Sequence, residues 1–251
     1  MDNSHIANFQ KEVYLFSQED QMKKITVLAG ALSCLFLFST AAPAAVTMDS
    51  AVKSALSQAD GKVKEIELDS ENNIAVYDIT IIDSKGVQHE IKIDAVKGSV
   101  HKYQKDNVDN RITAMYSLTK IDYTDAIKTA TENSKNSRVK KVDLSTDNGS
   151  PVYKIEFVDE QGIEYISRIN ATNGTLISLK QDTSVNGKPS VSVKDAEKAA
   201  LNVVKGDVIY TELDKDDGML LYKVKIISND SKLYEAKVNA TSGNVIKAEM
   251  D

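Results

Sequence analysis

Two short stretches of the sequence contain residue types that could support chemistry. His89 and Glu90 place an imidazole next to a carboxylate, and histidine changes its charge near neutral pH, so this pair could act in acid–base catalysis or hold a metal. The segment from Asp214 to Gly218, Asp-Lys-Asp-Asp-Gly, gathers three carboxylates, as loops that bind calcium do. Whether either stretch forms a site depends on the elements that position it.

A tyrosine and a turn recur three times at equal spacing. In each copy a tyrosine opens an alternating strand, and an Asp/Asn-Ala-x-x-Gly segment begins seventeen residues later. The marker residues are Tyr77, Asp94 and Gly98 in the first copy, Tyr153, Asn170 and Gly174 in the second, and Tyr222, Asn239 and Gly243 in the third. Equal internal spacing in three copies indicates one supersecondary unit repeated in tandem.

A helix followed by four strands is predicted in each copy. Thr47, Asp122 and Ser192 are residue types that cap helix N-termini, and each stands four residues before the first of two alanines spaced i, i+4. These signals predict helices over residues 48–59, 123–134 and 193–204. Four short segments with alternating apolar residues follow, which is typical of half-buried antiparallel strands. The predicted fold class is α+β, with three tandem units that each pack one N-terminal helix on a four-stranded antiparallel meander.

The register of the repeats favours structural roles for the candidate residues. His89 shares a column with Tyr165 and Tyr234 on the core-facing side of the third strand, and the sequence has no H-E-x-x-H motif of a zinc peptidase. The Asp214 segment aligns with predicted hairpin turns and lacks the distal glutamate of a calcium loop. The Asp94 column suits an Asx turn, in which the side chain bonds its own backbone. We therefore predict no catalytic residue, metal ligand or cofactor, and no enzyme activity.

Charge and cysteine content exclude several classes of function. The formal net charge of the 251 residues is −6, and lysines are interleaved with acids rather than gathered into a stripe. A protein that neutralises phosphates needs a local basic surplus, so nucleic acid is not expected as a partner. The only cysteine, Cys34, lies in an apolar run near the start of the chain, so the folded repeats offer no thiol for disulfides, metals or nucleophilic attack.

The N-terminal part of the chain has the features of an export signal. Met22-Lys23-Lys24 forms a charged region, an apolar run covers residues 25–38, and small residues follow up to Ala45. We predict a signal peptide over residues 22–45 that is cleaved near Ala44 or Ala45, with a retained membrane anchor as the alternative. Residues 1–21 precede the charged region and are expected to be a non-native upstream extension, with translation starting at Met22. No stable membrane span remains after cleavage.

The predicted boundaries divide the rest of the chain into three repeats and two linkers. The repeats cover residues 46–103, 119–179 and 191–251, and the linkers cover residues 104–118 and 180–190. The first linker contains Met115, Tyr116 and Leu118, which is too apolar for a free tether, so we expect it to pack against a neighbouring repeat. The second linker ends in Asn-Gly-Lys-Pro-Ser, a composition typical of loops.

The repeat resembles the PepSY domain. The matching segments are residues 93–100, 169–176 and 238–245, which follow the pattern (V/I)-(D/N)-A-x-x-G-x-(V/I/L) in register with the tyrosine and the helix cap. Three copies cover nearly all of the chain after residue 45. The departures are asparagine at Asn170 and Asn239, and Lys232 where the other copies have Val87 and Ile163.

The resemblance implies a function that involves no catalysis. The family is typically extracytoplasmic, is similar to a segment of metallopeptidase propeptides, and contributes no catalytic residues. We therefore expect a secreted or cell-envelope protein that binds a protein or peptide partner and modulates or inhibits an extracytoplasmic peptidase. The alternative is a cell-envelope scaffold or adhesion module without peptidase involvement. An unpaired sheet edge could accept an extended peptide by strand addition.

Overall fold

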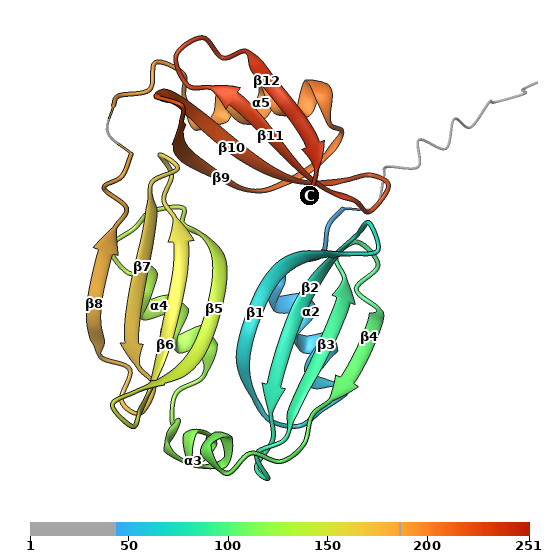
Figure 1. Ribbon diagram of the computed structural model, residues 1–251, viewed down its shortest axis with the longest axis vertical. Helices are drawn as coiled ribbons and strands as arrows, with labels where there is room; N and C mark the ends of the chain where they lie inside the picture. Colours follow the sequence, from blue (N-terminus) through green and yellow to red (C-terminus); the bar gives the residue numbers. More distant parts are fainter. Residues whose placement is uncertain (1–43, 186) are drawn as a thin grey trace, which may run out of the picture. The chain divides into compact units, whose positions relative to one another are not determined.

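One helix and four strands form each repeat in the computed structural model of the chain (Figure 1). The structure describes residues 44–185 and 187–251, so the predicted extension 1–21 and nearly all of the predicted signal peptide lie outside the described residues. The first repeat contains α2 (Met48–Leu56), β1 (Lys62–Glu71), β2 (Ile74–Ile82), β3 (Gln88–Asp94) and β4 (Val100–Lys105); the second contains α4 (Tyr123–Thr131), β5 (Arg138–Asp147), β6 (Ser150–Val158), β7 (Glu164–Asn170) and β8 (Leu176–Gln181); the third contains α5 (Val193–Val203), β9 (Gly206–Asp216), β10 (Met219–Ser228), β11 (Leu233–Asn239) and β12 (Val245–Met250).

The three repeat helices begin at the predicted caps. The side chains of Thr47, Asp122 and Ser192 each accept a backbone N–H from the first turn, which satisfies a donor that has no partner within the helix. The alanine pairs of the three helices are buried against the sheets, where their small side chains allow close approach. The helices end at Leu56, Thr131 and Val203, slightly before the predicted ends.

Two-residue turns connect the first and second strands of every repeat. Their φ angles are positive at both positions, as a type I′ turn requires, and the right-handed twist of the hairpin favours this turn. The pairs are Asn72 and Asn73 (52° and 63°), Asn148 and Gly149 (49° and 80°), and Asp217 and Gly218 (48° and 80°). The acidic segment that begins at Asp214 therefore closes the β9–β10 hairpin.

The strands of the first two repeats form one sheet rather than two separate meanders. The order is β4-β3-β2-β1-β5-β6-β7-β8, while the third repeat has its own sheet in the order β12-β11-β10-β9. β1 and β5 pair antiparallel, with Ile66 opposite Val142. Each of these two residues stands eleven positions before the marker tyrosine of its repeat, so equivalent residues face each other. The predicted layout of three tandem units, each with its own four-stranded meander, is thus only partly matched.

A fourth helix, α3 (Asn110–Leu118), lies in the segment predicted to be the linker 104–118. Asp109 caps it, and the side chain of Met115 is only 3% exposed within the core shared by the first two repeats. The expectation that this linker packs is therefore confirmed, but its helical structure was missed. β4 and β8 also run to Lys105 and Gln181, so both strands extend into the predicted linkers.

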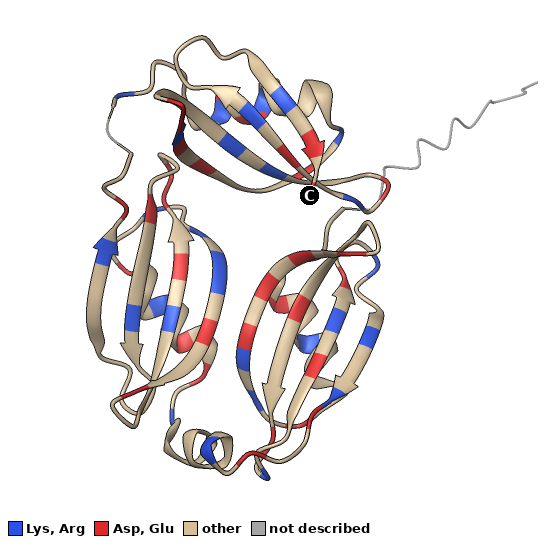
Figure 2. Ribbon diagram, in the orientation of Figure 1, with Lys and Arg blue, Asp and Glu red and all other residues tan. Residues whose placement is uncertain are grey.

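Two hydrophobic clusters hold the described residues together. One runs through the first two repeats, where α2 and α4 cover the same face of the eight-stranded sheet, and also includes Ile227 and Leu233 of the third repeat. The other lies within the third repeat under α5 (Figure 1). We call the opposite face of each sheet, which none of the described helices covers, its outer face. Acidic and basic residues are interspersed along the strands (Figure 2). No helix among the described residues is long and apolar enough to cross a membrane.

Direct hydrogen bonds and ion pairs join the second repeat to the third. The backbone N–H of Leu213 donates to the carbonyl of Gly162 over 2.8 Å. The ammonium group of Lys140 lies between the carboxylates of Glu164 and Glu212. Burial alone would lower the pKa of Lys140, but the two carboxylates outweigh it and raise that pKa above its ordinary value.

Candidate functional site

The Asp/Asn-Ala-x-x-Gly turn binds the start of its own repeat. In the first copy, Asp94 Oδ1 accepts the N–H groups of Val96 and Lys97, both over 2.9 Å, and Gly98 adopts a φ of 67°. The carbonyl of Ala95 accepts the N–H of Val46 over 2.8 Å, just before the helix cap. Asn170 and Asn239 make the same side-chain bonds, and Ala171 and Ala240 accept the same backbone bonds from residues 120–121 and 190–191. The side chains at this position are thus engaged in hydrogen bonds within their own turns.

The marker tyrosines are buried, and their hydroxyl groups bond to backbone carbonyls. Tyr77 donates to Val46 over 3.2 Å and Tyr222 donates to Val191 over 3.0 Å, at equivalent positions. Tyr153 donates instead to Val63 of the first repeat over 3.4 Å. Burial raises the pKa of Tyr77 to about 12. Tyr77 and Tyr222 thus connect the sheet to the helix entry, Tyr153 connects the second repeat to the first, and all three hydroxyl groups are engaged.

His89 forms a buried contact within the first repeat. Its Nδ1 lies 2.7 Å from the hydroxyl of Tyr103, and its Nε2 lies 3.4 Å from a carboxylate oxygen of Asp83. Burial would raise the pKa of Asp83, but bonds from the N–H groups of Val87 and Lys85 and from His89 hold it below its usual value. A carboxylate, an imidazole and a hydroxyl in series could relay a proton. The imidazole is only 6% exposed, however, so a substrate has almost no access to it.

The acidic β9–β10 turn is neutralised by lysines of neighbouring strands. Asp214 pairs with Lys223, and Asp216 pairs with Lys237 over 3.2 Å. Within the described ranges, no group of three or more His, Cys, Asp or Glu side chains is arranged to hold a metal ion. At the predicted cleavage site, Ala44 is exposed, and the N–H of Ala45 donates to Asp207 Oδ2 over 2.7 Å.

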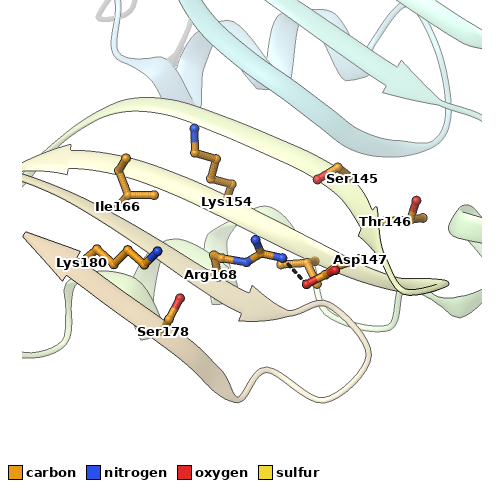
Figure 3. A pocket seen from close by; sticks show the side chains of 9 residues that line it. Ser145, Thr146, Asp147, Lys154, Ile166, Arg168, Ser178 and Lys180 are labelled. Carbon is orange, nitrogen blue, oxygen red and sulfur yellow. Dashed lines mark hydrogen bonds and ion pairs between the residues drawn. The ribbon is translucent and has the colours of Figure 1, made fainter.

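A hollow of about 390 Å³ on the outer face of β5–β8 is the candidate functional site (Figure 3). We call it the repeat-2 hollow. Its lining residues are Ser145, Thr146, Asp147, Val152, Lys154, Ile166, Arg168, Ser178 and Lys180. Three cations come from three neighbouring strands, because Lys154 lies on β6, Arg168 on β7 and Lys180 on β8. None of these lining residues was predicted from the sequence to form a site.

Strand register places the cations of the repeat-2 hollow side by side. Lys154 of β6 is opposite Arg168 of β7, and Lys180 of β8 is opposite Ile166 of β7. Arg168 pairs with Asp147 at one end of the hollow (Figure 3), and Lys154 pairs with Glu156 over 2.6 Å. Adjacent strands lie about 4.8 Å apart, so Lys154 and Arg168 are direct neighbours across the sheet, whereas Lys180 lies diagonally from Arg168, whose direct partner on β8 is Ser178. Such a cluster of cations can bind carboxylate or phosphate oxygens by charge-assisted hydrogen bonds.

The repeated helix-plus-meander, closed by a turn that binds the helix entry, defines a class of α+β repeat proteins. The sequence model of the PepSY family, described as "Peptidase propeptide and YPEB domain", matches residues 45–103, 120–180 and 190–249. The chain therefore belongs to the PepSY family, which confirms the resemblance inferred from the repeated turn.

Several proteins are similar to parts of the chain. The YkoJ protein of Bacillus subtilis strain 168 is 27% identical over 115 residues, which are 45% of this chain and 65% of that protein. The chain thus spans less than two thirds of this relative. Among solved structures, the C-terminal domain of YpeB from Bacillus megaterium is 18% identical, with a TM-score of 0.31, and the match covers 82% of this chain and 98% of that one. YpmB from Bacillus subtilis is 16% identical, with a TM-score of 0.23, over 51% of this chain and 97% of the other.

Proposed function

We propose that the chain is an exported, non-catalytic protein that binds a protein or peptide partner and thereby modulates or inhibits an extracytoplasmic peptidase. The family description names peptidase propeptides, which supports a link to peptidases. The proposal includes cleavage of a signal peptide near Ala44 or Ala45 and a location outside the cytoplasm. It rests on one structural observation in particular, the open edge of the eight-stranded sheet at β8.

β8 is the last strand of its sheet, and it is exposed along nearly its whole length. Leu176 and Leu179 are opposite Ile169 and Ser167, whose side chains are buried, so both leucines lie on the helix-covered side of the sheet. They remain 46% and 45% exposed, because no further strand covers them. An unpaired edge with exposed apolar side chains is suited to receive an extended segment of another protein. We propose this edge as the partner site.

Capture of the partner tests the proposal. The full chain is expressed in the producing organism with a tag after Asp251, and proteins retained from the culture supernatant and the cell envelope are identified. Extracytoplasmic peptidases of the same organism are then assayed with and without the purified chain. The proposal requires a peptidase that is both retained and altered in activity.

A variant of the β8 edge shows whether strand addition is the mode of binding. Leu176→Lys together with Leu179→Lys places two charges on the β8 edge, and we expect loss of the partner. Neither leucine belongs to the hydrophobic core of the repeat. Ile246→Lys on β12, an edge strand of the other sheet at which this residue is 51% exposed, is the control and should retain the partner. Partner capture that survives the β8 change would contradict the proposal. Retention on cell wall without any effect on a peptidase would indicate a scaffold instead.

A further inference from the structure

We propose that the repeat-2 hollow binds the acidic side chains of an extended peptide segment that pairs with β8. This inference rests on the proposed function and specifies the partner as a segment in which acidic and apolar residues alternate. It rests on a comparison of equivalent outer-face positions in the three repeats, because the residues at these positions differ in charge. The third strand has a cation at one column in all three copies, at Lys92, Arg168 and Lys237.

The first repeat neutralises this cation with its own acids. Lys92 lies 2.5 Å from Asp78, 3.5 Å from Asp69 and 3.6 Å from Glu71. Burial would lower the pKa of Lys92, but these carboxylates, Asp78 foremost, raise it above the ordinary value. The cation in the first repeat is therefore fully engaged within the repeat.

The third repeat also has a carboxylate partner for each of the two cations at the equivalent positions of its second and third strands. Lys237 pairs with Asp216 over 3.2 Å, and Lys223 pairs with Asp214. Asp214 occupies the column of Asp69 in the first repeat. The first and third repeats thus share an acidic residue at this position of the first strand.

The second repeat lacks the acid that the first and third repeats share. Ser145 stands where the other repeats have Asp69 and Asp214, and Lys154 stands where the first repeat has Asp78. Arg168 retains Asp147 as its ion-pair partner, and Lys180 has no ion-pair partner among the described residues. Lys154 pairs with Glu156, so Lys180 is the cation of the repeat-2 hollow that has no carboxylate partner among the described residues.

The β8 edge connects this charge to the proposed mode of binding. Ser178 and Lys180 face the repeat-2 hollow, whereas Leu176 and Leu179 face the other side of the sheet. Side chains of a strand alternate between the two faces, so a segment paired to β8 would direct every second residue towards the hollow, about 4.8 Å from β8. Acidic residues at those positions would meet Lys180, and apolar residues between them would cover the two leucines.

A short peptide in which glutamate and valine alternate is the probe. Its binding to the purified full chain is measured by fluorescence anisotropy, next to a peptide with lysine in place of glutamate and a peptide of the same composition with all glutamates first. We expect only the alternating acidic peptide to bind, with an affinity that falls as salt increases. Equal binding of the block peptide, or tighter binding of a single-stranded oligonucleotide than of the alternating peptide, would overturn the proposal.

The repeats themselves supply matched variants. Ser145→Asp with Lys154→Asp reproduces the acids of the first repeat, an arrangement that already folds in this protein, and should weaken peptide binding about tenfold or more. The control Asp69→Ser with Asp78→Lys changes the same columns of the first repeat and should leave binding at β8 intact. Undiminished binding in the first variant, or an equal loss in the control, would contradict the role of the hollow.

The outcomes separate this inference from the proposed function. If the natural partner is captured through the β8 edge and the Ser145→Asp, Lys154→Asp variant captures it equally well, the acidic specificity is wrong and the proposed function stands. If the alternating peptide binds but no partner depends on β8, the proposed function is wrong and the peptide preference stands.

Discussion

The hydroxyl group of Tyr222 donates a hydrogen bond to the backbone carbonyl of Val191, 3.0 Å away. Val191 directly precedes Ser192, the cap of α5, so this bond joins the second strand of the meander to the entry of the helix. Tyr77 makes the same bond to Val46. The bond gives the tyrosine hydroxyl a structural role in the first and third repeats, which a large apolar residue could not fill.

Removal of this hydroxyl should destabilise the third repeat. Tyr222→Phe leaves a carbonyl without its partner in the repeat core, and we expect a loss of about 1–2 kcal/mol in the free energy of unfolding, measured by urea denaturation. Tyr153→Phe is the control, because its bond is longer, at 3.4 Å, and runs to a different element. A smaller loss for Tyr222→Phe than for Tyr153→Phe would refute this role.

The Asp94 carboxylate should make stability depend on acid pH. Burial would raise its pKa, but the N–H groups of Lys97 and Val96 and the Lys97 ammonium outweigh it, so the pKa in the folded protein is below its ordinary value. A depressed folded-state pKa contributes stability that is complete above the unfolded-state pKa, about 3.9, and is lost as pH falls through the folded-state pKa. Asp94→Asn should therefore flatten the decline of stability in that acid range. Asn170 and Asn239 show that asparagine preserves the turn; an unchanged pH profile would contradict the prediction.

Two glycine substitutions distinguish backbone conformation from inter-repeat contact. Gly162 and Gly149 have φ angles of 81° and 80°, so alanine should cost about 1 kcal/mol at each through strain alone. A Cβ at Gly162 would also lie 3.1 Å from the Thr211 carbonyl oxygen and 3.2 Å from the Leu213 nitrogen, whereas one at Gly149 would meet nothing within 4 Å. We expect Gly162→Ala to cost about 1–3 kcal/mol more than Gly149→Ala, measured by chemical denaturation. Equal costs would show that the junction of the second and third repeats contributes nothing at this position.

The His89 contact should affect stability and not function. His89→Phe keeps a ring in a column that holds Tyr165 and Tyr234 in the other repeats, and it removes the contacts to Tyr103 and Asp83. Because Tyr103 is 45% exposed, water can replace its lost partner, and we expect a stability loss of about 1 kcal/mol. Binding of the alternating acidic peptide should not change. A loss of binding without a loss of stability would assign His89 a functional role.

Local signals in the sequence were sufficient for the helices and turns. Thr47, Asp122 and Ser192 predicted helix starts because a cap acts on the backbone within three residues of it. The helix α3 was missed because its segment is not part of the repeated pattern. Its signal was present, since the cap Asp109 precedes Ile112, Met115 and Tyr116 at helical spacing.

Strand pairing between repeats and the repeat-2 hollow depend on residues far apart in the chain. Lys141 of β5 reaches both Glu65 and Glu67 of β1, and this complementarity becomes visible only when the two strands are placed side by side. The hollow was missed for a related reason. Repeats are recognised by the residues that they share, whereas the hollow differs from the other copies, with Ser145 in place of an aspartate and Lys180 in place of Gln104 and Glu249.

The antiparallel pairing of β1 with β5 brings Ile66 opposite its own counterpart Val142. A local two-fold axis therefore passes between these residues, and the backbone pairing of the joint is isologous. The side chains break this symmetry, because Lys141 stands at the position that Glu65 has in the first repeat. Two copies of the first repeat joined in the same way would bring Glu65 close to Glu67, so the covalent link holds together two repeats whose charges have become complementary.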